Sequence, residues 1–249
     1  MRADQLLVER GLASSRSQAQ RLIASGVRWH DGLRWNQVAR NRDEVPDAAE
    51  IELLDDAEAR YVSRGGLKLE GALLATGIDV TGRDCLDVGQ STGGFTDCLL
   101  RKGAVHVTGV DVGSGQLHAM IRDDPRVTCI EKVNARELEL DATFSFITGN
   151  LSFISSTLVL PALVPLLEHG GDLLMLIKPQ FELQPGQVGK GGIVKDEALY
   201  AVVEKRIRDC CADLGLAVRG WYDSAIEGGD GNREFFVHAT KNQDKEEGA

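Results

Sequence analysis

No segment of the sequence is long and apolar enough to cross a bilayer. The longest strongly apolar run, residues 158–167, has ten residues and contains Pro161 and Pro165, whereas a transmembrane helix needs about 20 apolar residues. The first twelve residues lack the apolar region and the small-residue cleavage site of a secretory signal. The five cysteines form no Cys-X-X-Cys pair, and their odd number argues against a disulfide framework or a zinc site. We therefore expect a cytoplasmic protein without membrane attachment and without a metal.

Two common nucleotide-binding motifs are also missing. No G-x-x-x-x-G-K-[ST] segment is present, which disfavours a Walker-type NTPase. A dinucleotide-binding turn would read G-x-G-x-x-G, but residues 89–94 read Gly-Gln-Ser-Thr-Gly-Gly, with Ser91 at the position of the second glycine. That glycine admits a pyrophosphate, so its replacement favours a nucleotide ligand without one, such as S-adenosylmethionine.

The net charge of -10, from 28 basic and 38 acidic residues, argues against a nucleic-acid binder only if the charges are evenly spread. They are not. Residues 1–42 carry eight arginines and three acidic residues, a net charge of +5, and residues 43–58 carry eight acidic residues and no basic one. The remaining chain is acidic, with a net charge of -7. The sequence therefore predicts a small basic head, an acidic segment and a large acidic body.

The basic head is predicted to hold two short helices followed by strands. Residues 15–18 read Ser-Arg-Ser-Gln, the pattern of a helix-capping box, and apolar residues continue at helical spacing to Gly26, where the helix should stop. Residues 51–53 alternate as a last strand. Trp29 and Trp35 either complete the small core, the interpretation we favour, or stack on bases. A generic arginine-rich helical hairpin is the alternative to an RNA-binding head.

From residue 62 onward, buried strands alternate with helices, which is typical of a doubly wound, mostly parallel sheet of the Rossmann-like α/β class. The expected strands cover residues 84–88, 105–110, 127–130, 144–148, 173–177, 216–221 and 234–239. The expected helices cover residues 66–76, 93–102, 154–167 and 196–214.

Polar residues follow the expected strands at the edge where such sheets bind nucleotides. Asp111 ends the second strand, 24 residues after Asp87, and is placed to accept hydrogen bonds from ribose hydroxyls. The alternative is that Asp111 caps a helix beginning near Gly113. Asn134 and Ala135 follow the third strand, where they would flank an adenine.

Four further polar residues are candidates for catalysis. Lys68 lies on the helix before the first strand, and Asn150 ends the fourth strand. Lys178 directly follows the fifth strand, and Glu234 begins the last one. For either lysine the alternative is an ordinary solvated side chain. The glycine-rich residues 186–192, which include Lys190, form either a hinged lid over this edge or a simple connection.

The head resembles the S4 RNA-binding module through L-L-V-E-R-G-L, S-R-x-x-A-x-x-L-I and G-V. The body resembles the FtsJ-like domain through S-R-G-G-x-K-L, D-V-G-x-S-T-G-G-F-T-D-C-L-L, K-P-Q-F-E and G-N-x-E-F. Together they are similar to the haemolysin-A (TlyA) family, in which an S4 module precedes an FtsJ-like ribosomal-RNA 2'-O-methyltransferase. The resemblance implies S-adenosylmethionine as cofactor, ribosomal RNA or a ribosomal subunit as partner, and four segments: 1–59 (S4-like), 60–64 (linker), 65–241 (methyltransferase) and 242–249 (polar tail).

The resemblance also implies site residues. The family uses a Lys-Asp-Lys-Glu tetrad, of which Lys68, Lys178 and Glu234 carry over, whereas Asn150 stands in place of the aspartate. A second departure is Gln90, where a small alanine is usual beside the cofactor. The implied cofactor-binding residues are Asp87, Gly89, Ser91, Gly93, Gly94, Phe95, Asp111, Val112, Asn134, Ala135 and Asn150. The implied RNA-binding residues are Arg2, Arg16, Arg21, Arg28 and Lys190.

Methyl transfer to a ribose requires that the 2'-hydroxyl be placed in line with the methyl group and that its proton be removed or shared. A lysine does this only when desolvation and a neighbouring cation lower its pKa. Lys68 would be that cation for Lys178, and Glu234 would orient the pair. Because Asn150 removes one negative charge from the cluster, two hypotheses follow: an rRNA 2'-O-methyltransferase, which we favour, and a catalytically impaired RNA-binding or ribosome-assembly factor.

Overall fold

The computed structural model describes residues 1–54 and 59–242. The chain forms two compact units, Met1–Leu67 and Lys68–Ala249, which are described separately. Of the expected polar tail, residues 243–249 lie outside the described residues, as do residues 55–58 of the acidic segment.

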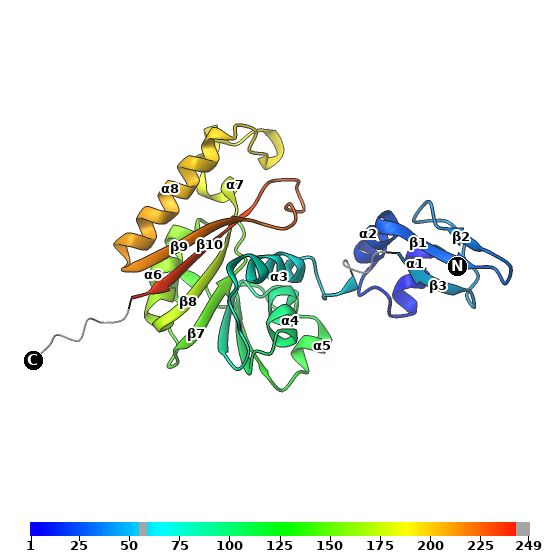
Figure 1. The fold of residues 1–249 in the computed structure, drawn as a ribbon, viewed down its shortest axis with the longest axis horizontal. Coiled ribbons are helices and arrows are strands. Elements are labelled where there is room, and N and C mark those ends of the chain that lie inside the picture. The colour runs from blue at the N-terminus through cyan, green and yellow to red at the C-terminus, as the bar shows by residue number, and fades with distance from the viewer. Residues whose placement is uncertain (55–58, 243–249) are drawn as a thin grey trace, which may run out of the picture. The chain divides into compact units, whose positions relative to one another are not determined.

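The first unit is a small α+β fold (Figure 1). Helices α1 (Ala3–Glu9) and α2 (Arg16–Gly26) precede an antiparallel sheet of order β2-β1-β3, built from β1 (Val27–His30), β2 (Trp35–Gln37) and β3 (Glu50–Leu53). The side chain of Ser15 accepts a hydrogen bond from the Gln18 N–H, as the capping pattern predicts. Helix α2 ends at Gly26, where φ is +122°. The predicted two helices and following strands are therefore present.

The two tryptophans of this unit have different surroundings. Trp29 packs against the buried core formed by residues such as Leu6, Leu22 and Val27, which is the role we expected. Trp35 lies at the surface with 37% of its area exposed, edge-on to His30 and under the Arg28 guanidinium. The core interpretation therefore holds for Trp29 and is wrong for Trp35.

The second unit contains the expected seven-stranded, mostly parallel sheet, in the order β6-β5-β4-β7-β8-β10-β9. Strands β4 to β8 are parallel neighbours, and β10 pairs antiparallel with both β8 and β9. The strands are β4 (Asp84–Val88), β5 (His106–Asp111), β6 (Val127–Glu131), β7 (Phe144–Gly149), β8 (Leu167–Ile177), β9 (Leu216–Asp223) and β10 (Phe235–Lys241).

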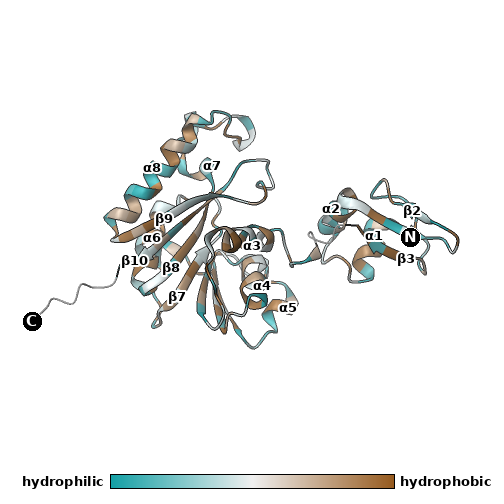
Figure 2. Cartoon of the chain, in the orientation of Figure 1, coloured by the Kyte–Doolittle hydropathy of each residue, from teal (hydrophilic) through white to brown (hydrophobic). Residues whose placement is uncertain are grey.

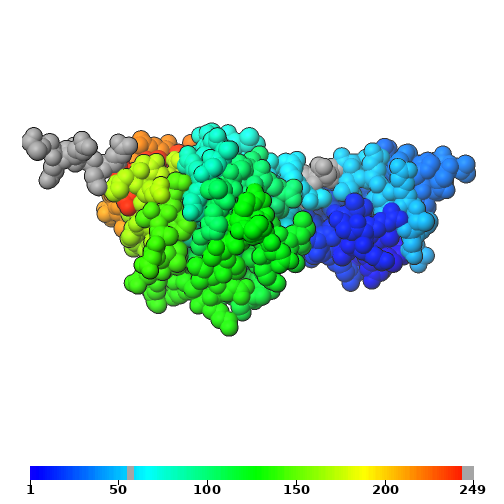
Figure 3. Space-filling view, turned by 90° about the horizontal axis from the view of Figure 1, so that it is seen from below, coloured from blue at the N-terminus to red at the C-terminus, as the bar shows by residue number. Residues whose placement is uncertain are grey.

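The helices of this unit are α3 (Gly65–Thr76), α4 (Gly94–Arg101), α5 (Ala119–Arg122), α6 (Leu160–Leu163), α7 (Pro179–Glu182) and α8 (Ala198–Asp213). Helix α3 begins in the last residues of the first unit, and α8 packs along β9 (Figure 1). On the face seen in Figure 3, the surface of this unit is formed mainly by its first half, coloured cyan to green.

Two expected elements differ from the structure. The helix expected over residues 154–167 is broken into a 3-10 turn, the four-residue α6 and a second 3-10 turn. Pro161 and Pro165 each stand in the first turn of a new short element, because proline has no N–H to continue a helical ladder. Strand β8 begins at Leu167, six residues before the expected 173. Its first part was not predicted because residues 168–172 read Glu-His-Gly-Gly-Asp, which lacks the apolar pattern of a buried strand.

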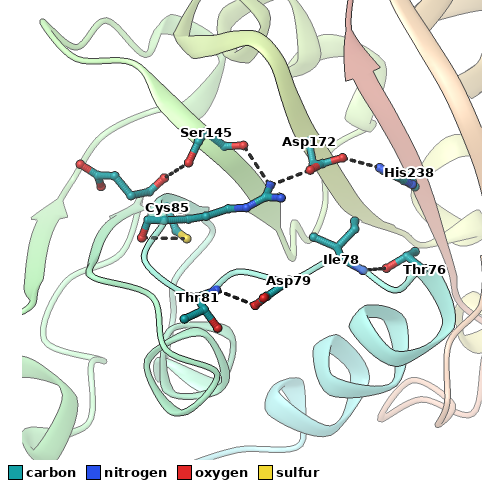
Figure 4. Close-up of polar contacts among 10 residues, drawn as sticks. Thr76, Ile78, Asp79, Thr81, Cys85, Ser145, Asp172 and His238 are labelled. Atoms are coloured by element: carbon teal, nitrogen blue, oxygen red, sulfur yellow. Dashed lines mark hydrogen bonds and ion pairs between the residues drawn. The ribbon is translucent and has the colours of Figure 1, made fainter.

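The core of the second unit lies around the central strands, which are coloured brown in Figure 2. Residues 173–177 of β8 are buried without interruption, as expected for a strand covered on both faces. At the amino ends of β4 and β7, Arg83 donates to Asp172 at 2.6 Å, and His238 Nε2 lies 2.8 Å from the other oxygen of the same carboxylate (Figure 4). This network ties the antiparallel β10 to the parallel part of the sheet.

Candidate active site

The turn between β4 and α4 depends on glycine for steric reasons. Gly89 and Gly93 have φ values of +80° and +92°. A Cβ at Gly89 would lie 2.9 Å from the Asn150 carbonyl oxygen, and one at Gly93 would lie 2.7 Å from Leu117. The turn therefore passes close to the end of β7, and Ser91, with φ of +49°, stands at its crest.

A cavity of about 550 Å³ opens beside this turn, at the carboxyl ends of β4 to β7. Seven of the eleven predicted cofactor residues line it: Gly89, Ser91, Asp111, Val112, Asn134, Ala135 and Asn150. The other four, Asp87, Gly93, Gly94 and Phe95, are buried behind the turn. The cavity wall also includes residues to which the sequence assigned no role: Gly113, Gln116, Val133, Leu151, Ser152, Phe153, Ile154 and Val159.

Asp111 connects the turn to the end of β5. Its carboxylate accepts hydrogen bonds from the Ser91 N–H and the Gly113 N–H, both at 2.7 Å. The helix that Asp111 would cap in the alternative interpretation does not begin there, since α5 starts only at Ala119 and is capped by His118. Asp111 thus fixes the crest of the turn and faces the cavity with its remaining acceptor capacity.

A buried polar cluster lies beneath the turn. Asp87 accepts a hydrogen bond from the Thr96 hydroxyl at 2.7 Å, and Gln90 donates to the same hydroxyl at 2.9 Å. Burial raises the pKa of Asp87 to about 7, although its hydrogen bonds from Thr96 oppose that shift. Gln90 does not line the cavity, because its side chain lies under β5 against Gly109. This departure from the family pattern therefore leaves the cavity open.

The three predicted catalytic residues that match the family tetrad, Lys68, Lys178 and Glu234, lie near one another in the structure. Lys68, 7% exposed, forms an ion pair with Glu234 just before β10. Lys178 follows β8 and donates to the Ser152 hydroxyl at 2.9 Å. Burial lowers the pKa of Lys178 to about 8; the Glu234 carboxylate opposes this shift, the positive charge of Lys68 adds to it, and Asp230 opposes it. Neither lysine is an ordinary solvated side chain.

Asn150 directly follows β7, and its backbone carbonyl lies close to Gly89 of the turn. The residue is part of the cavity lining, and its Oδ1 atom is buried without a hydrogen-bond partner. The hydroxyl that holds Lys178 belongs to Ser152, two residues further along. Nothing in the sequence alone assigned a role to Ser152.

Two of the predicted RNA-binding arginines converge on one buried acid in the first unit. Arg2 donates two hydrogen bonds to Asp4, and Arg16 donates a third, each at 3.0 Å. Arg28 pairs with Glu52 and lies 4.7 Å above the Trp35 ring. These arginines are therefore held in place rather than freely solvated.

Beside them lies a hollow of about 570 Å³. Its lining residues are Arg2, Gln20, Ala39, Arg40, Asn41 and Arg42. Arg40 and Arg42 were not among the predicted RNA-binding residues, although the count of arginines in the head pointed to them. The other two predicted RNA-binding residues are Arg21, which is half-buried on α2, and Lys190, which is exposed in the glycine-rich segment of the second unit.

Within the described residues, no cluster of three or more His, Cys, Asp or Glu side chains has the geometry to hold a metal ion. All five cysteines are free thiols. None of the described helices is long and apolar enough to span a membrane.

Comparison with known proteins identifies the family. The FtsJ-like methyltransferase model matches residues 61–241, and the S4 domain model matches residues 1–26. The 16S/23S rRNA (cytidine-2'-O)-methyltransferase TlyA of Mycobacterium tuberculosis is 44% identical over 239 residues, 95% of this chain and 88% of that protein. The chain belongs to the TlyA family of FtsJ-like methyltransferases.

Two further proteins are similar to this chain over most of their length. Hemolysin A of Brachyspira hyodysenteriae is 38% identical over 242 residues, 96% of this chain and 99% of that protein. The solved structure of a haemolysin from Streptococcus thermophilus superposes with a TM-score of 0.75 at 38% identity, covering 98% of this chain and 89% of that one. The predicted family, α/β fold and methyltransferase class are therefore confirmed.

Proposed function

We propose that this chain transfers a methyl group from S-adenosylmethionine to a ribose 2'-hydroxyl of ribosomal RNA, in the cytoplasm where ribosomes are made. The observation that carries the proposal is the placement of Lys178. Its amine, with a pKa lowered to about 8, is bonded to Ser152, and Ser152 itself forms part of the cavity wall. A proton acceptor thus stands beside a cavity of nucleotide size.

The lining residues fit this cofactor chemically. The Asp111 carboxylate suits ribose hydroxyls, and the apolar side chains of Val112 and Val133 suit the faces of an adenine. The close approach of the chain at Gly89, and the buried, unpartnered Oδ1 of Asn150, mark the end of the cavity where a polar ligand group would complete the hydrogen bonding. When bound, the cofactor supplies a strongly electrophilic methyl group on a sulfonium.

The protein's own part in the reaction is to handle a proton. In its neutral form, Lys178 donates one N–H to Ser152 and keeps a lone pair that accepts the proton of the ribose hydroxyl. Lys68 helps to keep Lys178 neutral, because a second positive charge nearby is unfavourable. Glu234 stabilises the buried Lys68 ammonium by pairing with it.

The second hypothesis, a catalytically impaired RNA-binding or ribosome-assembly factor, rests on Asn150. What favours the enzyme is that Lys178 donates its hydrogen bond to Ser152 and that burial lowers its pKa, neither of which needs a carboxylate at position 150. Asn150 changes the charge of the cavity wall without removing the proton acceptor.

The S4 unit supplies the contact with RNA. Its arginine-lined hollow and the arginines on Asp4 form a preorganised basic surface, which suits the phosphates of structured RNA. The relatives' names point to a cytidine in ribosomal RNA, and we propose the same class of target, in free RNA or in a ribosomal subunit.

Transfer of a labelled methyl group to ribosomal RNA and to purified subunits tests the proposal. We expect label in the wild type and none with Lys178→Ala, whereas Lys195→Ala, an exposed lysine outside the cavity, should retain transfer. Mass spectrometry of the labelled RNA should locate the methyl on a ribose. Tight RNA binding without transfer to any of these RNAs would favour the assembly factor.

A further inference from the structure

One buried carboxylate joins the loop that lines the cavity to the segment that follows β8 and contains α7. Residues 150–156 follow β7, and residues 178–183 follow β8. Glu182, in the second loop, is 2% exposed. Its side chain accepts hydrogen bonds from the Ser155 hydroxyl and, at 2.7 Å, from the Ser156 N–H, both in the first loop. The two loops are therefore held together by groups far apart in the sequence.

A buried carboxylate is costly unless it is fully hydrogen-bonded, so these bonds constrain the loop that donates them. The Glu182 backbone carbonyl in turn accepts a hydrogen bond from Arg206 on α8 at 2.6 Å. Glu182 is thus bonded to the 16-residue helix α8 through its backbone carbonyl and to the cavity loop through its carboxylate.

The loop that is hydrogen-bonded to Glu182, residues 150–156, also lines the cavity. Residues 151–154 all form part of its wall, and Ser152 accepts the hydrogen bond from Lys178. Phe153 has a φ of +63°, an uncommon backbone conformation for an aromatic residue that persists only where the surroundings enforce it. The bonds at Ser155 and Ser156 directly follow this strained segment.

Lys178 and Glu182 lie at opposite ends of α7, and both reach the same loop, Lys178 at Ser152 and Glu182 at Ser155 and Ser156. Accepting the function proposed above, we propose that Glu182 is a positioning residue: it holds the cavity wall at 152–154 against Lys178 and so sets both cofactor affinity and the geometry of proton acceptance. It touches neither the cofactor nor the ribose.

The test compares Glu182→Ala and Glu182→Gln in the full-length chain. We expect Glu182→Ala to weaken S-adenosylmethionine binding, measured by calorimetry, and to lower kcat, each by about tenfold or more, because misplacement near 1 Å is that costly. The pH midpoint of kcat should also move, since Lys178 loses its fixed partner. Glu182→Gln retains an acceptor for the Ser156 N–H and a second polar group for Ser155. It should therefore keep most of the wild-type cofactor affinity and kcat.

Asp172→Asn is the matched control, because Asp172 is likewise a paired carboxylate but lies on β8, away from the cavity loop. It should lower the unfolding temperature and leave kcat, cofactor affinity and the pH midpoint of the folded protein unchanged. If Glu182→Ala does not fold, Ser155→Ala, which removes one bond and leaves the carboxylate paired with Ser156, should show an intermediate loss of cofactor affinity.

Folded Glu182→Ala with wild-type cofactor affinity, kcat and pH midpoint would overturn the proposal and leave Glu182 a purely structural carboxylate. If Glu182→Ala does not fold, an unchanged cofactor affinity in Ser155→Ala would overturn the proposal in the same way. A wild type that binds S-adenosylmethionine but methylates no RNA would instead refute the proposed function, while the affinity measurements would still decide the role of Glu182.

Discussion

Gln90 and Gly109 fit each other so closely that a Cβ at residue 109 would lie 2.0 Å from the Gln90 amide. Gln90 is 3% exposed and donates to Thr96, which in turn bonds Asp87. The long side chain at position 90 is therefore accommodated within the sheet, by the absence of a side chain on the neighbouring strand.

This fit predicts a strong coupling between the two positions. Gly109→Ala should destabilise the protein by about 1–3 kcal/mol, because overpacking forces the Gln90 side chain out of its place. Adding Gln90→Ala should restore part of that loss, so that the free energies of unfolding of the two single variants do not sum to that of the double variant. Denaturant unfolding of the four proteins measures this, and additive values would contradict the close packing of these residues.

The glycine turn of the site was predictable, because a strand, the turn and a helix follow one another in the chain. The place of Asp111 beside the turn was predictable as well, because Asp111 ends the next strand. The contacts of Ser152 with Lys178 and of Glu182 with Ser155 were not predictable. They depend on how the segments after β7 and β8 approach each other, which the pairing of the two strands determines.

Other predictions differed from the structure because the sequence pattern did not contain the deciding information. The apolar spacing of residues 154–167 predicted one helix, but two prolines divide it. Gln90 was read as a group beside the cofactor, because nothing in the sequence relates it to Gly109. Asp4 was counted only as a charge opposing the arginines of the head, yet it organises two of them.

The lowered pKa of Lys178 predicts the pH dependence of methyl transfer. Only the neutral amine accepts a proton, so the single-turnover rate should fall about tenfold for each pH unit below a midpoint near 8 and level off above it. Asp230→Asn should move the midpoint to lower pH, because the Asp230 carboxylate stabilises the protonated lysine. A rate independent of pH between 6 and 9, with chemistry shown to be rate-limiting, would exclude Lys178 as the proton acceptor.

A carboxylate at position 150 should change cofactor discrimination. The Oδ1 atom of Asn150 is buried in the cavity wall, so a negative charge there would be poorly screened. Asn150→Asp should strengthen binding of the cationic S-adenosylmethionine relative to its neutral demethylated product, by several-fold, and should shift the pH midpoint of transfer upward. Calorimetry with both ligands checks the first effect. Asn150→Ala is the control, and an unchanged affinity ratio in Asn150→Asp would place residue 150 away from the sulfonium.

The buried Asp4 predicts a link between the stability of the S4 unit and RNA binding. Burial alone would raise the pKa of Asp4, but hydrogen bonds from Arg2, Arg16 and Gln20 outweigh it and lower the pKa to about 2. Because this lies below the value of 3.8 for an unperturbed aspartate, the stabilisation is complete above about pH 4 and is lost as the pH falls toward 2.

Asp4→Asn should therefore destabilise the first unit by about 1–3 kcal/mol at neutral pH, because charge-assisted hydrogen bonds are lost. It should also weaken RNA binding and make it less dependent on salt, since Arg2 and Arg16 would no longer be held in position to contact phosphates. Asp31→Asn, on the loop between β1 and β2, is a control that removes the same charge from the same unit without touching these arginines. Equal RNA affinity and salt dependence in Asp4→Asn and wild type, measured where both are folded, would show that Asp4 stabilises the fold without organising the RNA-binding surface.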